Sequence, residues 1–152
     1  MTIQPDPQPT YIDGLPRFNH VAISVPAAVL SPAGRAQLLE VYGDVFGMAE
    51  LPTMTDDDHR LVMSVGHWDQ FVFLIADDQP MVAPRLDHYG LSVSSRRDFD
   101  ACWERAQVAA TTHEGVDLIA PSSEDHGPVI LHSFYMGYVL PMMIEIQYWE
   151  FT

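Results

Sequence analysis

The chain has 152 residues, a length typical of one compact domain, and 47% of them are hydrophobic. It contains 21 acidic residues, seven arginines and no lysine, which gives a net charge of −14. Such a surface repels phosphate backbones, so we expect no nucleic-acid partner and no polyanionic substrate unless several arginines converge on one pocket. Apolar runs far shorter than the roughly 20 residues that span a bilayer, and an N-terminus without a basic and then apolar region, predict a cytoplasmic protein with no membrane span. The single cysteine, Cys102, excludes an intramolecular disulfide and a Cys-rich zinc site.

The first half of the chain begins with an extended, proline-containing arm over residues 1–16. A strand is expected over 17–25, and Ser31-Pro32 then provides an N-cap followed by proline at the first helical position. Apolar residues at helical spacing predict a helix over 32–46, which Gly47 ends. Three further strands are expected, over 48–54, 60–65 and 71–76.

The second half repeats this order after a loop that contains two aspartates and two prolines. We expect a strand over 86–93, a helix over 96–108 that Ser94-Ser95 can cap, and a loop over 121–128 between two of the last strands. Those last three strands are expected over 116–120, 129–135 and 142–149. The pattern is βαβββ twice, with modules over 17–78 and 86–149, and an internal repeat at this scale outweighs any local assignment.

The first strands of the two modules share a chemical pattern. Phe18-Asn19-His20 and Leu86-Asp87-His88 each precede alternating residues that close on Ser-Val. Successive side chains on a strand point to opposite faces, so each strand has one bulky apolar face and one face of small residues that carries a single histidine. The same reading groups Met143, Glu145 and Gln147 on one face of the last strand.

With these features, residues 17–149 resemble the vicinal oxygen chelate superfamily, which includes glyoxalase I, extradiol dioxygenases, fosfomycin-resistance enzymes and bleomycin-binding proteins. The resemblance implies an α+β fold in which two tandem βαβββ modules form a curled mixed sheet around a metal-binding cleft. Ligands in that superfamily commonly come from the first strand of each module and the last strand of the second. The matching residues are His20, His88 and Glu145.

Two imidazoles and one carboxylate suit a divalent transition metal with open positions, so Fe(II) is favoured, with Zn, Ni or Mn as other possibilities. A carboxylate amid so much apolar sequence is costly to bury without a partner, which is a physical reason for a cation beside Glu145. Glyoxalase-like members add a fourth ligand, but alignment of the two halves puts Phe73 at that position. A register shift would bring in Gln70 or Asp77 instead.

Three residues of the second module are candidates for catalysis in this cleft: His132, Tyr135 and Tyr138. His132 is either a general base that lines the pocket or a hydrogen-bonded structural histidine, because the apolar residues around it do not decide its face. Either tyrosine could donate a hydrogen bond to a bound oxygen substrate, or else pack as an aromatic side chain.

The leading hypothesis is a non-haem Fe(II) dioxygenase-like enzyme acting on a small aromatic or vicinal-oxygen substrate. A glyoxalase-type lyase or isomerase with another divalent metal is the first alternative, and a thiol transferase of the fosfomycin type ranks third because its anionic substrate needs cations. The rival from another class is a metal-free protein that binds a drug or metabolite. Related proteins pair modules across a dimer, so we expect a homodimer.

Overall fold

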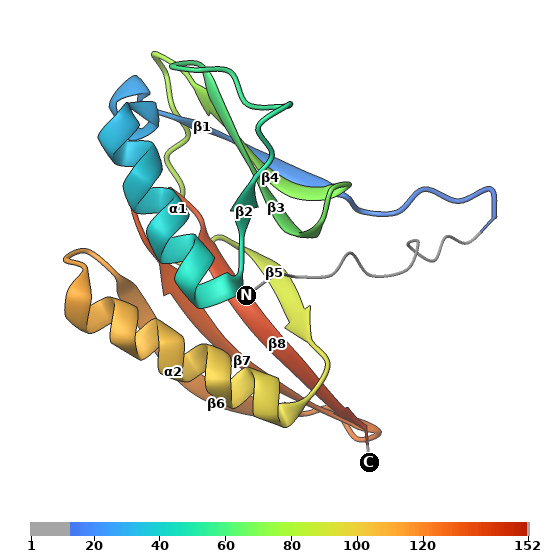
Figure 1. Ribbon diagram of the computed structural model, residues 1–152. Helices are drawn as coiled ribbons and strands as arrows, with labels where there is room; N and C mark the ends of the chain where they lie inside the picture. Colours follow the sequence, from blue (N-terminus) through green and yellow to red (C-terminus); the bar gives the residue numbers. More distant parts are fainter. Residues whose placement is uncertain (1–12, 152) are drawn as a thin grey trace. The chain divides into compact units, whose positions relative to one another are not determined.

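The computed structural model describes residues 13–151, so most of the predicted proline arm lies outside the described residues. The chain divides into two compact units, the first ending at Met81 and the second beginning at Val82. Each unit has its own sheet and its own α-helix (Figure 1). Neither helix in the described part of the chain is long and apolar enough to cross a membrane.

The first unit is a four-stranded sheet in the order β1-β4-β3-β2. Strand β1 runs parallel to β4, while β3 is antiparallel to both β4 and β2. A short 3-10 helix, η1, precedes the long helix. The elements are β1 (His20–Val25), η1 (Ala27–Leu30), α1 (Pro32–Phe46), β2 (Ala49–Glu50), β3 (Arg60–His67) and β4 (Gln70–Ala76).

The second unit repeats this topology strand for strand. Its sheet has the order β5-β8-β7-β6, with β5 parallel to β8 and the other neighbours antiparallel. The predicted fold class, α+β with two tandem βαβββ modules, is therefore confirmed. The elements are β5 (His88–Val93), α2 (Arg96–Thr112), β6 (Asp117–Asp125), β7 (Val129–Gly137) and β8 (Met143–Phe151).

Local signals set the ends of both α-helices. The Ser31 hydroxyl accepts a hydrogen bond from the Gly34 N–H at the start of α1, and Gly47 ends that helix in the left-handed conformation at φ 71°. This conformation favours glycine because it has no Cβ to clash. Ser95 caps α2 by accepting from the Asp98 N–H. Helix α1 has the predicted bounds, whereas α2 extends four residues beyond its predicted end, to Thr112.

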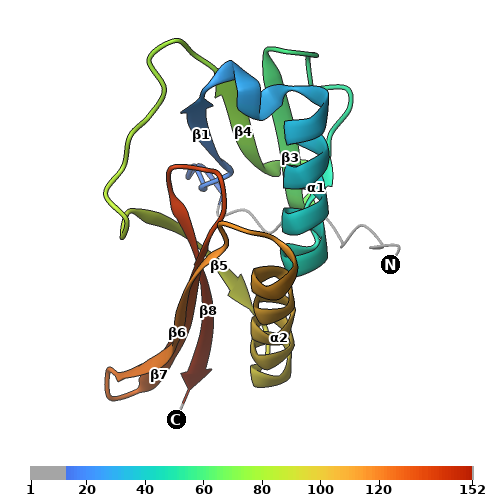
Figure 2. The same cartoon turned by 90° about the vertical axis from the view of Figure 1, so that its left-hand side faces the viewer.

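In each unit the α-helix lies beside the strands of its own sheet (Figure 2). Phe134 of β7 is fully buried and makes T-shaped contacts with Phe99 and Trp103 of α2, at centroid distances of 5.4 and 5.1 Å. Because side chains alternate along a strand, one face of each sheet is committed to this core. The opposite face carries His20 in the first unit and His88 in the second.

Two predicted segments were wrong. The strand expected over 48–54 is only Ala49–Glu50, because residues 51–59 form a series of turns closed by backbone hydrogen bonds such as Met54 N–H to Leu51 O. The loop expected over 121–128 is mostly strand, since β6 continues to Asp125. Its Pro121 lies where the β6–β7 register shifts between Ile119 and Ser122, on the outer strand of the sheet. Proline is tolerated at such bulges and edges, where no ladder hydrogen bond is lost.

Candidate metal centre

His88 and Glu145 meet on the sheet of the second unit. Strands β5 and β8 are parallel neighbours in which His88 pairs with Met143 and Gly90 pairs with Glu145. Paired residues point to the same face, so the histidine and the carboxylate lie on one side of the sheet. The His88 Nε2 atom is 3.4 Å from Glu145 Oε2. Two of the three predicted ligands are therefore neighbours.

The Glu145 carboxylate is buried, with 6% of the residue exposed, and both of its oxygens accept hydrogen bonds. The Tyr135 hydroxyl donates to Oε1 at 2.7 Å, and the Gln147 amide donates to Oε2 at 2.6 Å. The hydrogen bond to Glu145, with a smaller contribution from desolvation, raises the pKa of Tyr135, so this tyrosine keeps its proton. The carboxylate is thus held in one orientation.

The protonation of His88 follows from its other ring nitrogen. Nδ1 lies 2.7 Å from the Leu86 carbonyl oxygen, which can only accept, so Nδ1 carries the hydrogen. In the neutral ring, Nε2 then has a lone pair that faces the carboxylate oxygen 3.4 Å away. Two acceptors at this separation need a proton or a cation between them. A backbone carbonyl holding the far nitrogen is also the usual support of a metal-binding histidine.

In the first unit, His20 is likewise held through its Nδ1 atom. Its Nδ1 donates to the Asn19 side-chain oxygen at 2.8 Å, and its ring stacks on Phe71 with centroids 4.9 Å apart. Nε2 is therefore again the nitrogen with the available lone pair. In neither unit taken alone, over residues 13–151, do three His, Cys, Asp or Glu side chains gather into a metal site.

The first unit has no fourth ligand at the position equivalent to Glu145. Ala22 pairs with Phe73 in the parallel β1–β4 ladder as Gly90 pairs with Glu145 in the β5–β8 ladder. Alternation along β4 puts Gln70 on the face opposite that of Phe73. Asp77 follows the strand, and its carboxylate accepts from the Gln79 N–H.

Of the three predicted catalytic residues, only Tyr135 lies beside Glu145. His132 points to the opposite face of the sheet, where it stacks on Tyr148 at 5.6 Å and lies 6.3 Å from the Phe99 ring of α2. Both of its ring nitrogens make hydrogen bonds, and it does not line the Glu145 side of the sheet. Tyr138 follows β7, is buried, and contacts His113 at the end of α2.

Gln147 is the residue that the sequence analysis did not assign to the site. Its amide donates to Glu145 while its carbonyl accepts from the Trp149 indole N–H at 3.2 Å. The chain of contacts therefore runs along β8 from Trp149 to the buried carboxylate. The available signal was the period-2 pattern, which puts residues 145, 147 and 149 on one face.

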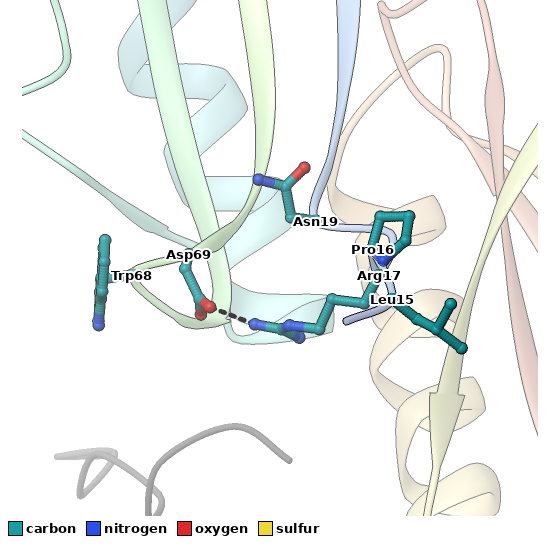
Figure 3. A pocket seen from close by; sticks show the side chains of 6 residues that line it. All are labelled: Leu15, Pro16, Arg17, Asn19, Trp68 and Asp69. Atoms are coloured by element: carbon teal, nitrogen blue, oxygen red, sulfur yellow. Dashed lines mark hydrogen bonds and ion pairs between the residues drawn. The ribbon is translucent and has the colours of Figure 1, made fainter. Parts of the chain in front are cut away.

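A hollow of about 380 Å³ lies in the first unit, next to the support of His20 (Figure 3). Figure 3 shows Arg17 reaching across to Asp69, with which it forms an ion pair. Asn19, whose side chain holds the His20 ring, contributes to the wall of this hollow. The residues that line it are Leu15, Pro16, Arg17, Asn19, Trp68 and Asp69.

No protein-family model matches the sequence, and no curated protein matches it significantly. The structure, however, is similar to several solved ones. A glyoxalase/bleomycin resistance protein/dioxygenase from Alicyclobacillus acidocaldarius is 14% identical, with 86% of this chain and 89% of that chain covered at a TM-score of 0.59. The fosfomycin resistance protein FosX from Mesorhizobium loti is 17% identical, with coverage of 90% and 92% and a TM-score of 0.55.

A lactoylglutathione lyase from Agrobacterium tumefaciens is 12% identical, with 86% of this chain and 92% of that chain covered at a TM-score of 0.58. These three proteins are of kinds that belong to the vicinal oxygen chelate superfamily. Each of these similarities covers at least 86% of this chain and therefore extends over both βαβββ modules. The chain therefore has the fold of the vicinal oxygen chelate superfamily.

Proposed function

We propose that this chain is a metal-dependent enzyme of the vicinal oxygen chelate type, in which His20, His88 and Glu145 bind one divalent ion, with Fe(II) favoured. Such an ion supplies Lewis acidity toward a substrate with two neighbouring oxygens and, when it is iron, redox chemistry with O2. Oxidative cleavage or oxygenation of a small aromatic compound is the reaction we favour.

One observation carries the proposal: Nε2 of His88, whose Nδ1 donates to the Leu86 carbonyl, faces a buried Glu145 oxygen at 3.4 Å. A cation at this place satisfies both acceptors at once, and it offsets the cost of burying the carboxylate. The donors to Glu145, from Tyr135 and Gln147, leave its remaining lone pairs for a ligand bond. His20 offers the third lone pair from a ring held in the same way.

The residues around Glu145 support an uncharged, apolar substrate. Leu131 pairs with Trp149 on the same face as Glu145, four residues along the strands from the Tyr135–Glu145 pair. None of the seven arginines of the chain falls within β5, β6, β7 or β8. A phosphonate or a dicarboxylate would therefore find no arginine on these strands, and Arg85, which precedes β5, already pairs with Asp117 of β6, whereas an aromatic ring would find apolar surface. Tyr135 offers its hydroxyl at the polar end of this surface, where a substrate oxygen would lie.

Metal analysis of protein purified without chelator tests the site. We expect about one divalent ion per chain, and loss of that ion in the His20→Ala, His88→Ala and Glu145→Gln variants. His126→Ala is the matched control, because His126 Nε2 also lies 3.4 Å from a carboxylate, that of Glu124, but in an exposed turn. Equal metal content in His88→Ala and His126→Ala would contradict the site.

The identity of the metal and O2 uptake distinguish the enzyme classes. Stoichiometric iron, together with O2 consumption on a panel of catechols, would support the oxygenase. Zinc, nickel or manganese without O2 uptake would favour the glyoxalase-type lyase, the function named for one of the similar structures. A protein that binds small aromatics without any metal, and does so equally well as His88→Ala, would be the drug- or metabolite-binding alternative.

We also propose that the chain forms a homodimer. Large apolar side chains are exposed in both units, with Phe18, Trp68 and Phe151 each at least 75% exposed, and such surface favours association. Light scattering coupled to size exclusion should therefore report twice the chain mass of 17.1 kDa. A mass of one chain at micromolar concentration would contradict the dimer.

A further inference from the structure

A second cluster of chemically reactive side chains lies on the opposite face of the second unit's sheet. The Ser123 hydroxyl on β6 is 2.7 Å from Nδ1 of His132 on β7. Nε2 of the same histidine is 2.6 Å from the Glu150 carboxylate on β8. Ser123 pairs directly with His132 in the ladder. Three neighbouring strands thus align a hydroxyl, an imidazole and a carboxylate.

The hydrogen bonds determine which atoms carry protons. The Glu150 carboxylate only accepts, so Nε2 of His132 carries a hydrogen and donates it. In the neutral ring Nδ1 then holds a lone pair, and the Ser123 hydroxyl is the donor of the 2.7 Å contact. This is the tautomer in which a histidine can take a proton from a serine, with the carboxylate stabilising the imidazolium that forms.

The cluster also combines an accessible hydroxyl with a fixed base. Ser123 is exposed, whereas His132 is 8% exposed and is held between its two hydrogen bonds and the Tyr148 ring, with planes 12° apart. Residues on strands hold such geometry better than residues on loops. Strand β6 is the outer strand of its sheet, and a free strand edge presents backbone N–H groups that can donate to an oxyanion.

We propose that Ser123 is an activated nucleophile, with His132 as its general base and Glu150 as the residue that positions His132, and that this site hydrolyses small carboxylic esters. The Glu145 side chain lies on the other face of the sheet, so the proposed ester hydrolysis requires no metal. The proposed metal-dependent function assigns no role to these three residues.

The reaction has two balanced steps. In the first, Ser123 Oγ bonds to the ester carbonyl carbon, His132 Nδ1 takes the serine proton, and that proton passes to the departing alkoxide as the C–O bond breaks. In the second, the oxygen of a water molecule bonds to the acyl carbon while Nδ1 takes a water proton, and that proton passes to Ser123 Oγ as the acyl C–Oγ bond breaks. The net reaction converts one ester and one water into one acid and one alcohol.

Two neighbouring serines make the experiment specific. Ser122 and Ser123 are both exposed on β6, but alternation points them to opposite faces, and only Ser123 contacts His132. The full-length protein in EDTA is treated with a fluorophosphonate probe, the modified residue is mapped by mass spectrometry, and p-nitrophenyl acetate hydrolysis is measured. We expect the label on Ser123, no label in Ser123→Ala, and wild-type labelling and turnover in Ser122→Ala.

The two supporting residues have their own readouts. His132→Gln should lower the labelling rate by about 10²- to 10⁴-fold, the usual contribution of a general base. Glu150→Gln should lower kcat with KM unchanged, and Glu150→Asp should restore part of that loss. A thermal melt of each variant checks folding, and Ser123→Ala removes an exposed hydroxyl together with its hydrogen bond to His132. Absence of labelling in the wild type, or equal hydrolysis in Ser123→Ala and Ser122→Ala, would overturn the proposal without affecting the metal site.

Discussion

At the residue scale, the arrangement around Glu145 depends on which polar groups have partners. Tyr135 donates to Glu145, whereas the Tyr89 hydroxyl is buried and has no hydrogen-bond partner within residues 13–151. Burial raises the pKa of Tyr89 above its usual range, so its proton stays on the oxygen. The Tyr135 hydroxyl therefore stabilises the fold through a hydrogen bond, whereas the Tyr89 hydroxyl carries the cost of burying an unpaired polar group.

The same substitution at these two positions should have opposite effects. Tyr135→Phe leaves a buried carboxylate oxygen without a donor, so the free energy of unfolding of the metal-free protein should fall by about 1–3 kcal/mol. Tyr89→Phe removes an unsatisfied hydroxyl, so stability should stay the same or rise. Urea denaturation in EDTA measures both. Equal losses in the two variants would contradict this account of Glu145.

At the scale of the elements, the parallel pairing of first and last strands is what brings a histidine beside a carboxylate. The β5–β8 ladder does this for His88 and Glu145, and the β1–β4 ladder places Phe73 at the corresponding position. The two units thus share one topology but differ in chemistry, because the position of Glu145 in the second unit is occupied by Phe73 in the first. This is the physical basis for proposing three ligands rather than four.

An ion pair between two segments of the second unit gives a pH-dependent prediction. Arg85, before β5, donates two hydrogen bonds of 2.7 Å to Asp117 at the start of β6. These hydrogen bonds hold the pKa of Asp117 below its usual range. A carboxyl with a depressed folded-state pKa stabilises the fold above its unfolded pKa, and this stabilisation is lost as the pH falls through the folded pKa.

We therefore expect Asp117→Asn to melt below the wild type at pH 7, with the gap closing as the pH falls below about 4. Thermal melts followed by circular dichroism between pH 7 and pH 3 measure the gap. Arg85→Gln should show the same closing gap, since it removes the other partner. A gap that stays constant across this range would show that the ion pair does not cause it.

At the scale of the whole molecule, the charge imbalance acts on stability. A net charge of −14 on 152 residues produces self-repulsion in the folded state, which salt screens. The melting temperature should rise between about 10 mM and about 0.3 M NaCl at pH 7, over which the screening length falls severalfold. The same series near the sequence pI of about 4.5 is the control. There the net charge approaches zero, so the rise should disappear. An equal rise at both pH values would exclude charge screening as the cause.

Much of the fold was predictable because its signals are local. Ser31, Pro32 and Gly47 determine where α1 begins and ends, and the structure has those bounds. The repeat of one order of elements in each half predicted the two matching sheets. Pro121 led to a wrong prediction, because a proline with polar neighbours is typical of a loop unless it lies on an edge strand with a bulge. Whether a strand lies at the edge of its sheet and contains a bulge depends on how the whole sheet is paired, and the residues around Pro121 do not specify this.

The candidate site also combines features that the sequence predicts with features that only the structure shows. Alternation along a single strand predicts that Glu145 and Gln147 share a face, and that His132 and Tyr135 do not. Which of the latter two lies beside Glu145 depends on the β7–β8 register, in which Tyr135 pairs with Glu145 and His132 pairs with Tyr148. The sequence by itself determined most of the elements and their repetition, because these follow from local periodicity and caps, while the candidate ligands followed from the resemblance to the vicinal oxygen chelate superfamily. Only the tertiary structure decided which side chains meet, because strand register and the helix-covered face are set by packing between segments distant in sequence.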